Sequence, residues 1–155
     1  MLKLFKILAV ISLAGVPAYA GGGLETQFAR QRSHLTCYEG PTDEPSCGGT
    51  WLKVYTRGKS IQKLEWENEM SQRLIRREFY FQRGKLRLVI ERSYFLLDDE
   101  AYRLAKPRCE YCRRVWISPD SKANRSRRAL VREANYLLRQ YRTHRAQFVA
   151  RSSAK

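Results

Sequence analysis

The sequence has no apolar run long enough to cross a membrane as a helix. Such a helix needs about 20 consecutive apolar residues, and the longest uncharged, mostly apolar stretch, Ile7–Val16, has ten. Histidine is also scarce, and no serine or cysteine nucleophile can be matched by spacing to either His34 or His144. We therefore expect a binding protein and not an enzyme, with no metal and no cofactor.

Acidic residues are scarce in the last third of the chain. From 21 to 100 the sequence has 13 Lys and Arg against 12 Asp and Glu, but from 101 to 155 it has 15 against three. After Lys122 the single acid is Glu133. We therefore expect a balanced surface on the first part, while the last part carries nearly all of the positive charge.

The first 20 residues have the three parts of a secretory signal peptide in order. Lys3 and Lys6 form a positive start, Ile7–Val16 is the apolar segment, and Ala18 and Ala20 are the small residues before a cut after Ala20. The alternative is an uncleaved anchor at the membrane interface. We expect an exported, periplasmic or extracellular protein that begins at Gly21.

Four cysteines follow the predicted cut: Cys37, Cys47, Cys109 and Cys112. An even number of cysteines in an exported chain favours disulfides, and four cysteines allow three pairings. We favour Cys37–Cys47 and Cys109–Cys112 because each pair is local in sequence, with crossed pairs as the alternative. A zinc site is disfavoured, since the first spacing is wider than that of a usual zinc knuckle.

From residue 50 the chain is rich in β-forming residues. We expect strands at 51–56, 61–68, 72–82 and 85–95. The clearest turn is Arg83-Gly84, because a glycine adopts the positive φ of a tight hairpin without strain. Alternating residues give this meander one apolar face, which includes Ile75, Phe79, Phe81, Leu86, Leu88 and Ile90.

A long amphipathic helix is predicted over 118–151, and Ser118-Pro119-Asp120 is typical of a helix start. One side carries an apolar stripe: Leu130, Ala134, Leu137, Tyr141, His144 and Phe148. The opposite side carries Arg125, Arg128, Arg132, Arg139 and Arg142. A sheet with one apolar face needs a cover, so we expect the stripe to lie on the sheet and the arginines to face solvent.

Together these elements predict one α+β domain, an antiparallel β-meander of three to five strands packed by a long C-terminal helix. A leader with the first disulfide loop occupies 21–49, the meander 50–97, a connector with the C-x-x-C motif 98–117, and the helix 118–151. The segment from Leu24 to Tyr38 fits either a helix or a strand.

The hairpin region resembles a loose group of small exported bacterial proteins of unknown function. The residues that carry the resemblance are Glu78-Phe79-Tyr80-Phe81, Gly84-Lys85-Leu86 and Val89-Ile90-Glu91. They match an E-Y-Y-F strand, a G-K-L turn and an F-V-x-E strand, with departures at Arg87 and Leu88. The resemblance covers about a third of the chain and implies an exported β-meander, without any site or activity.

Cys109-Glu110-Tyr111-Cys112 is the one recognisable chemical motif. In redox enzymes a C-x-x-C follows a strand and begins a helix, whose dipole lowers the pKa of the first thiol. No β-α-β pattern surrounds this motif, so we expect a structural disulfide. A thiol-disulfide redox protein is the alternative.

The row of arginines is the strongest functional signal. A solvated helix face is one explanation, but uncompensated like charges repel one another, which an anionic partner would relieve. Outside the cytoplasm, the expected partner is lipopolysaccharide, an anionic lipid, an acidic polymer or an acidic protein. Nucleic acid is disfavoured, since no recognised reader fold is evident. A structural envelope protein, or a protein-directed inhibitor or immunity-type factor acting through the Asp43-Glu44 loop, is the alternative.

Overall fold

The computed structural model describes residues 23–43, 49–70, 72–95, 109–118 and 124–151. The chain begins with helix α1 and the short 3-10 helix η1, and it ends with helix α3, the 3-10 helix η3 and a last strand. The bounds are α1 Gly23–Gln31, η1 Arg32–His34, β1 Thr36–Pro41, β2 Thr50–Arg57, β3 Ser60–Met70, β4 Arg73–Gln82, β5 Lys85–Phe95, β6 Cys109–Trp116, α3 Arg125–Thr143, η3 Arg145–Gln147 and β7 Val149–Arg151.

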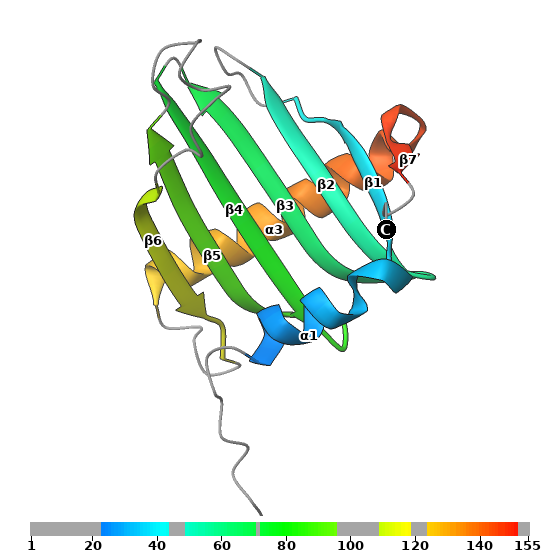
Figure 1. The fold of residues 1–155 in the computed structure, drawn as a ribbon, viewed down its shortest axis with the longest axis horizontal. Coiled ribbons are helices and arrows are strands. Elements are labelled where there is room, and N and C mark those ends of the chain that lie inside the picture. Colours follow the sequence, from blue (N-terminus) through cyan, green and yellow to red (C-terminus); the bar gives the residue numbers. More distant parts are fainter. Residues whose placement is uncertain (1–22, 44–48, 71, 96–108, 119–123, 152–155) are drawn as a thin grey trace, which may run out of the picture.

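The strands form one antiparallel sheet in the order β6-β5-β4-β3-β2-β1-β7 (Figure 1). Strands β1 to β6 follow one another as a meander, and β7 returns to pair with β1. The predicted α+β meander with a long C-terminal helix is confirmed. The predicted strand count is wrong, because the described residues contain seven strands and not three to five.

The main core lies between α3 and one face of the sheet. Figure 1 shows α3 crossing the strands behind the sheet. Leu130, Ala134, Leu137 and Tyr141 of the helix pack on a cluster that includes Leu52, Leu64 and Phe79 of the strands. Leu137 and these three strand side chains are fully buried. These four residues of the predicted stripe therefore cover the sheet as predicted. The other two lie beyond the helix: His144 is its half-buried C-cap, and Phe148 follows η3.

The opposite face of the sheet carries a second, smaller apolar cluster under α1. Leu24 and Phe28 of α1 pack against Tyr80, Leu88 and Ile90, and Figure 1 shows α1 in front of the strands. The prediction of a single apolar face is therefore wrong. Leu88 and Ile90 reach this face because of a register shift in the β4–β5 ladder opposite Tyr80 and Phe81, since one extra residue on β5 reverses the side-chain alternation beyond it.

This shift separates residues that the sequence placed on one face. Leu86 packs on the α3 side of the sheet, whereas Leu88 and Ile90 pack on the α1 side. The β4–β5 hairpin itself forms where predicted, and both Arg83 and Gly84 at its turn have positive φ values, 52° and 73°. The turn chemistry therefore predicts the hairpin correctly, and the bulge changes only the assignment of faces.

The predicted helix 118–151 is too long at both ends. Helix α3 begins at Arg125, and its N-cap is Asn124, whose side-chain oxygen accepts hydrogen bonds from the backbone N–H groups of Ser126 and Arg127. The helix ends at Thr143, after which Val149–Arg151 form β7. The predicted start at Ser118-Pro119-Asp120 is therefore wrong for this helix, since an asparagine cap outside that motif supplies the acceptor.

The C-terminal segment closes the sheet edge at β1. Phe148, which follows η3, is buried beside Tyr141 with ring centroids 5.1 Å apart. Its ring lies over Gly40 of β1, where an added Cβ would sit 2.9 Å from the nearest ring carbon. Beyond it, Arg151 of β7 lies 2.9 Å from the Glu39 carboxylate. The missing side chain at Gly40 thus allows the aromatic ring to pack directly on the strand.

Of the predictions for the N-terminal part of the chain, some concern residues that the structure describes and others do not. The predicted signal peptide, residues 1–20, lies outside the described residues, as does most of the Gly-rich leader. The undecided segment from Leu24 to Tyr38 forms both alternatives in turn, helix α1 and then the start of β1. No helix among the described residues has the length and apolar character that crossing a membrane requires.

Candidate anion-binding surface

The packing of α3 determines where its arginines point. Because the stripe of buried residues faces the sheet, positions on the opposite side of the helix face solvent. All five arginines predicted there are exposed: Arg125, Arg128, Arg132, Arg139 and Arg142. We call these five residues the arginine face. The structure therefore brings the sequence-predicted residues together on one side of one helix.

The single acid of α3 does not neutralise the arginine face. Glu133 projects toward the sheet, where its carboxylate lies 2.6 Å from a guanidinium nitrogen of Arg77 on β4. Arg77 also donates to Glu91 of β5, at 2.5 Å. Burial by itself lowers the pKa of Arg77, but Glu133 and Glu91 outweigh it and raise the pKa above its ordinary value. Glu133 is thus bound to the sheet.

Positive charge is concentrated at the start of α3. Three arginines, Arg125, Arg127 and Arg128, lie in or next to the first turn, which contains no acid. The helix dipole already places partial positive charge at this end, and acidic residues are the favourable ones there. Cations at this end are each unfavourable by about 0.3–1 kcal/mol at low ionic strength. An anion bound here would reverse that unfavourable contribution.

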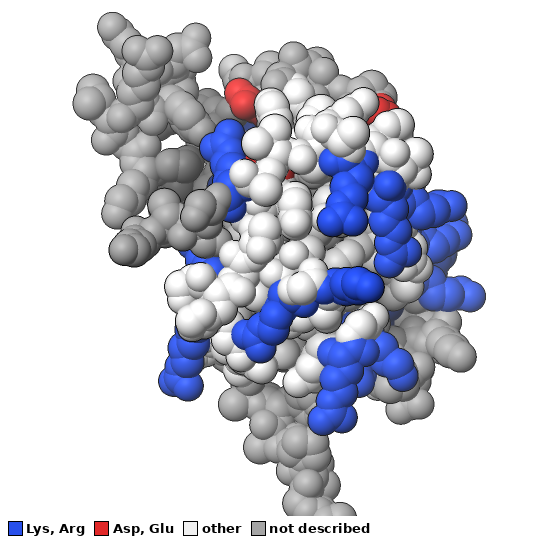
Figure 2. Space-filling model, turned by 90° about the vertical axis from the view of Figure 1, so that its right-hand side faces the viewer, with Lys and Arg blue, Asp and Glu red and all other residues white. Residues whose placement is uncertain are grey.

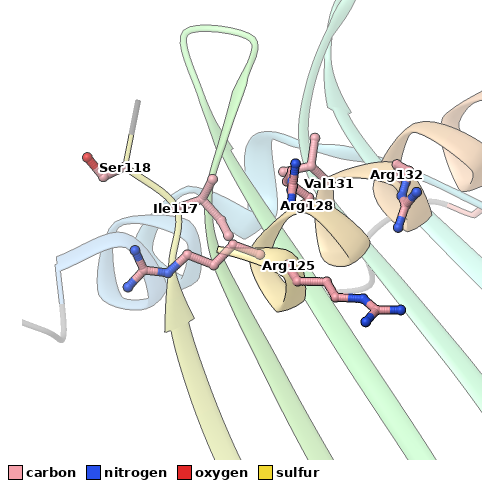
Figure 3. A pocket seen from close by; sticks show the side chains of 7 residues that line it. Ile117, Ser118, Arg125, Arg128, Val131 and Arg132 are labelled. Atoms are coloured by element: carbon pink, nitrogen blue, oxygen red, sulfur yellow. The ribbon is translucent and has the colours of Figure 1, made fainter. Parts of the chain in front are cut away.

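A cavity of about 570 Å³ opens beside this charged turn. Its lining comes from two elements, the residues after β6 and the first turns of α3, as Figure 3 shows. Three members of the arginine face line it, together with Arg127. Ile117 and Val131 supply an apolar part of the wall. The cavity therefore combines guanidinium groups with an apolar surface, and none of the described residues that line it is acidic.

The basic surface extends beyond the cavity. Arg145 of η3 is exposed and lies over the Tyr38 ring, 5.9 Å from its centroid. Figure 2 views the molecule from the side of β1 and β7, and on that side Lys and Arg far outnumber Asp and Glu. On this face of the molecule, basic side chains therefore dominate.

The two histidines lie at different places in the fold. His144 is the C-cap of α3, and its Nε2 lies 3.4 Å from a carboxylate oxygen of Asp43. His34 lies in η1 and is exposed. The Asp43–His144 contact connects the loop after β1 to the end of the helix, which sequence spacing could not indicate.

No disulfide joins the three cysteines that the structure describes. These are Cys37, Cys109 and Cys112. The predicted Cys37–Cys47 disulfide involves Cys47, which lies outside the described residues. Cys109 and Cys112 are both on β6, an edge strand among the described strands, and not at a helix start. They are three positions apart on this strand, beside a register shift in the β5–β6 ladder, and their sulfurs are not bonded to each other. The predicted Cys109–Cys112 disulfide is therefore not formed in the structure.

Burial raises the pKa of the Cys37 thiol, which lies on the α1 side of the sheet beside Tyr55. A raised pKa disfavours the thiolate, which is the reactive form of cysteine. Within the part of the chain that the structure describes, no three His, Cys, Asp or Glu side chains gather as metal ligands would.

A charged cluster that the sequence did not reveal lies on the α1 side of the sheet. Lys63 of β3 is 5% exposed and contacts the carboxylates of Glu65, at 3.0 Å, and Glu78. Its ammonium group also lies 4.9 to 5.6 Å from the centroids of three rings, those of Phe28, Tyr55 and Tyr80. Burial lowers the pKa of Lys63, and the carboxylate of Glu65 opposes this. The contacts satisfy the buried charge within the fold.

Two glutamates of β3 lie close to one arginine of β4. Glu67 lies 2.6 Å from Arg76, and Glu65 lies 3.9 Å from the same guanidinium. In the β3–β4 register Glu67 is directly opposite Arg76, and directly opposite side chains share a face of the sheet.

Comparison of the chain with protein-family models, with curated proteins and with solved structures finds no match. The candidate surface therefore has to be judged by its own geometry and chemistry.

Proposed function

We propose that the protein is an exported binding protein whose arginine face contacts an anionic partner of the cell envelope. The observation that carries the proposal is the orientation of α3. All five predicted arginines are exposed, while the single acid of the helix is turned to the sheet and bound to Arg77. A helix face that only maintains solubility ordinarily mixes both signs of charge.

Arginine suits such a partner chemically. Its planar guanidinium donates two parallel hydrogen bonds to a phosphate or a carboxylate and keeps its charge at every physiological pH. Lipopolysaccharide phosphates, anionic lipid headgroups, acidic polymers and acidic proteins all offer such groups. Export, expected from the first 20 residues, would bring the protein to these partners.

The test is a salt titration of binding, made on the protein purified after expression of the full chain. Lipopolysaccharide, anionic vesicles, a sulfated polysaccharide and DNA serve as probes. We expect binding to at least one non-nucleic anion that weakens steeply with salt, because exposed charges are screened over about 10 Å at 0.1 M ionic strength. Absence of binding to every anion at moderate salt would contradict the proposal.

A triple variant, Arg128→Gln, Arg132→Gln and Arg139→Gln, connects the binding to the helix. Each arginine near an anionic surface contributes about 1 kcal/mol, so we expect a loss of about 100-fold in affinity. The matched control removes three exposed charges from the hairpin turns, with Arg57→Gln, Lys59→Gln and Lys85→Gln. Equal losses in the two variants would show that only net charge matters and that the arginine face is not a site.

Export is tested separately. Mass spectrometry of the periplasmic fraction of an expressing cell should detect a chain that begins at Gly21. An intact N-terminus in the cytoplasmic fraction would contradict export, whatever the anion measurements show.

A further inference from the structure

We propose that the cavity at the start of α3 binds an anionic amphiphile, a phosphate-bearing headgroup joined to an alkyl chain. This inference rests on the proposed function and narrows the anionic partner to one class. The phosphate is held by Arg125, Arg128 and Arg132, and the first carbons of the chain lie against Ile117 and Val131.

The size of the cavity favours a ligand larger than a simple anion. Pockets that hold drug-sized ligands measure about 300–1,000 Å³, and a water molecule occupies about 30 Å³ of the liquid. At about 570 Å³, this cavity has room for a headgroup together with several carbons. An inorganic phosphate would leave most of the volume to water.

The cavity lining, like the proposed ligand, has a charged part and an apolar part. Ile117 is half-buried, with its side chain against the main core, and it reaches the cavity from the end of β6. Val131 is half-buried in the second turn of α3. A site for a sulfated sugar or for nucleic acid would favour polar or aromatic side chains at these two positions. Alkyl carbons gain from apolar contacts, by about 25 cal/mol per Å² removed from water.

The charge of the cavity is complementary to phosphate. Asn124 already accepts the hydrogen bonds of the Ser126 and Arg127 N–H groups at 3.0 and 3.3 Å, so an anion here would depend on the guanidinium groups. Arg125, Arg128 and Arg132 line the cavity from the first two turns of one helix, and Figure 3 shows their side chains pointing in different directions. Their mutual repulsion makes the empty cavity electrostatically unfavourable, and a doubly charged phosphate offsets it.

Two arginines of α3 that lie away from the cavity serve as a control for the proposed site. Arg139 and Arg142 belong to the same arginine face but do not line the cavity. A flat electrostatic contact with an anionic surface would use all five arginines about equally. A ligand bound in the cavity would depend on Arg125 and Arg128 and be nearly independent of the two distal residues.

The experiment uses calorimetry on the protein purified after expression of the full chain. It measures the affinity for inorganic phosphate, ethyl phosphate, butyl phosphate and octyl phosphate, each below the concentration at which it forms micelles. We expect the affinity to rise about fourfold for each buried methylene, until the chain fills the cavity. Vesicles with and without phosphatidic acid form a second arm, which distinguishes a free amphiphile from a lipid held in a bilayer.

Two pairs of variants locate the site. Arg125→Gln with Arg128→Gln should weaken octyl phosphate binding at least tenfold, whereas Arg139→Gln with Arg142→Gln should change it less than twofold. Val131→Trp, which fills the cavity without changing its charge, should abolish the dependence on chain length. Val131→Thr, a smaller change, should reduce that dependence if the tryptophan variant fails to fold.

The outcomes separate this inference from the proposed function. If anions bind but the affinity does not change with chain length, or if the distal pair matters as much as the cavity pair, the amphiphile site is refuted and the arginine face stands. If neither phosphates nor vesicles bind at low salt, this inference is refuted, and the broader panel of anions decides the proposed function.

Discussion

Replacing Gly40 by alanine tests how the C-terminal segment closes the sheet. The new Cβ would lie 2.9, 3.0 and 3.1 Å from three carbons of the Phe148 ring. Real Cβ atoms do not approach carbon so closely, so the ring or the strand has to move. The ring is buried and stands edge-on to Tyr141, 5.1 Å between centroids, which leaves it little freedom to turn away.

The expected loss in the free energy of unfolding combines two opposing effects. Overpacking of a well-filled core costs about 1–3 kcal/mol. The alanine also restricts the unfolded chain, which returns about 0.4–1 kcal/mol because Gly40 does not adopt a positive φ. We expect a net destabilisation of about 1–2 kcal/mol, measured by urea denaturation and seen as a fall in Tm of roughly 5 °C.

A second substitution shows whether the ring is the cause. Phe148→Ala removes the ring carbons Cγ, Cδ1 and Cδ2 that the new methyl group meets, so Gly40→Ala should cost much less in that background than in the natural one. Gly23→Ala is the control, because nothing lies within 4 Å of its added Cβ, and it should be nearly neutral. A neutral effect of Gly40→Ala, or equal costs in both backgrounds, would refute this account of the closure.

Three further substitutions test other parts of the fold. Leu137→Ala empties a fully buried position between α3 and the sheet and should cost about 2–5 kcal/mol in urea denaturation; a loss below 1 kcal/mol would argue that the helix does not pack there. Asn124→Ala should cost about 1 kcal/mol and Asn124→Asp should not, and equal effects would count against the cap. Burial raises the pKa of Glu65, but Lys63 outweighs it and lowers that pKa below its ordinary value, so this carboxylate stabilises the fold above about pH 4.3 and less as the pH falls through the lowered value. Glu65→Gln should therefore destabilise the protein at pH 7 and reduce its loss of stability in acid. If the free energy of unfolding falls with pH in the variant as steeply as in the natural protein, the role given to Glu65 is wrong.

The parts of the fold that the sequence predicts are those governed by local patterns. The turn residues Arg83-Gly84 predict the hairpin. Helical periodicity predicts the buried stripe of α3, which includes Leu130 and Leu137. The strands from 50 to 95 are found within a few residues for the same reason. Each of these patterns depends on residues that are close in sequence.

The elements that were missed depend on distant partners. Strand β7 has three residues and exists because β1 offers an edge for pairing. Strand β6 carries a run of exposed polar side chains and is formed by its ladder with β5. The bulge at Tyr80 and Phe81 has no local signal either, and it moves Leu88 and Ile90 to the face under α1.

The candidate site was predictable only in part. Helical periodicity is enough to place the five arginines on one side of α3, and the lack of acids after Lys122 is visible in the sequence. The cavity was not predictable, because Ile117 and Val131 meet only when the end of β6 lies beside the start of α3. The contact of Glu133 with Arg77 likewise joins residues that are distant in sequence.

The most direct test of the central claim is a nitrogen-15 NMR titration of the protein with octyl phosphate. If the arginine face binds anions and the cavity holds the ligand, the largest shift changes should occur at the amides of Ile117, Arg128 and Val131. Changes at Arg139 and Arg142 should be smaller and should disappear first as salt is added. Changes spread evenly over every basic residue of the molecule, or no changes at all, would contradict the account.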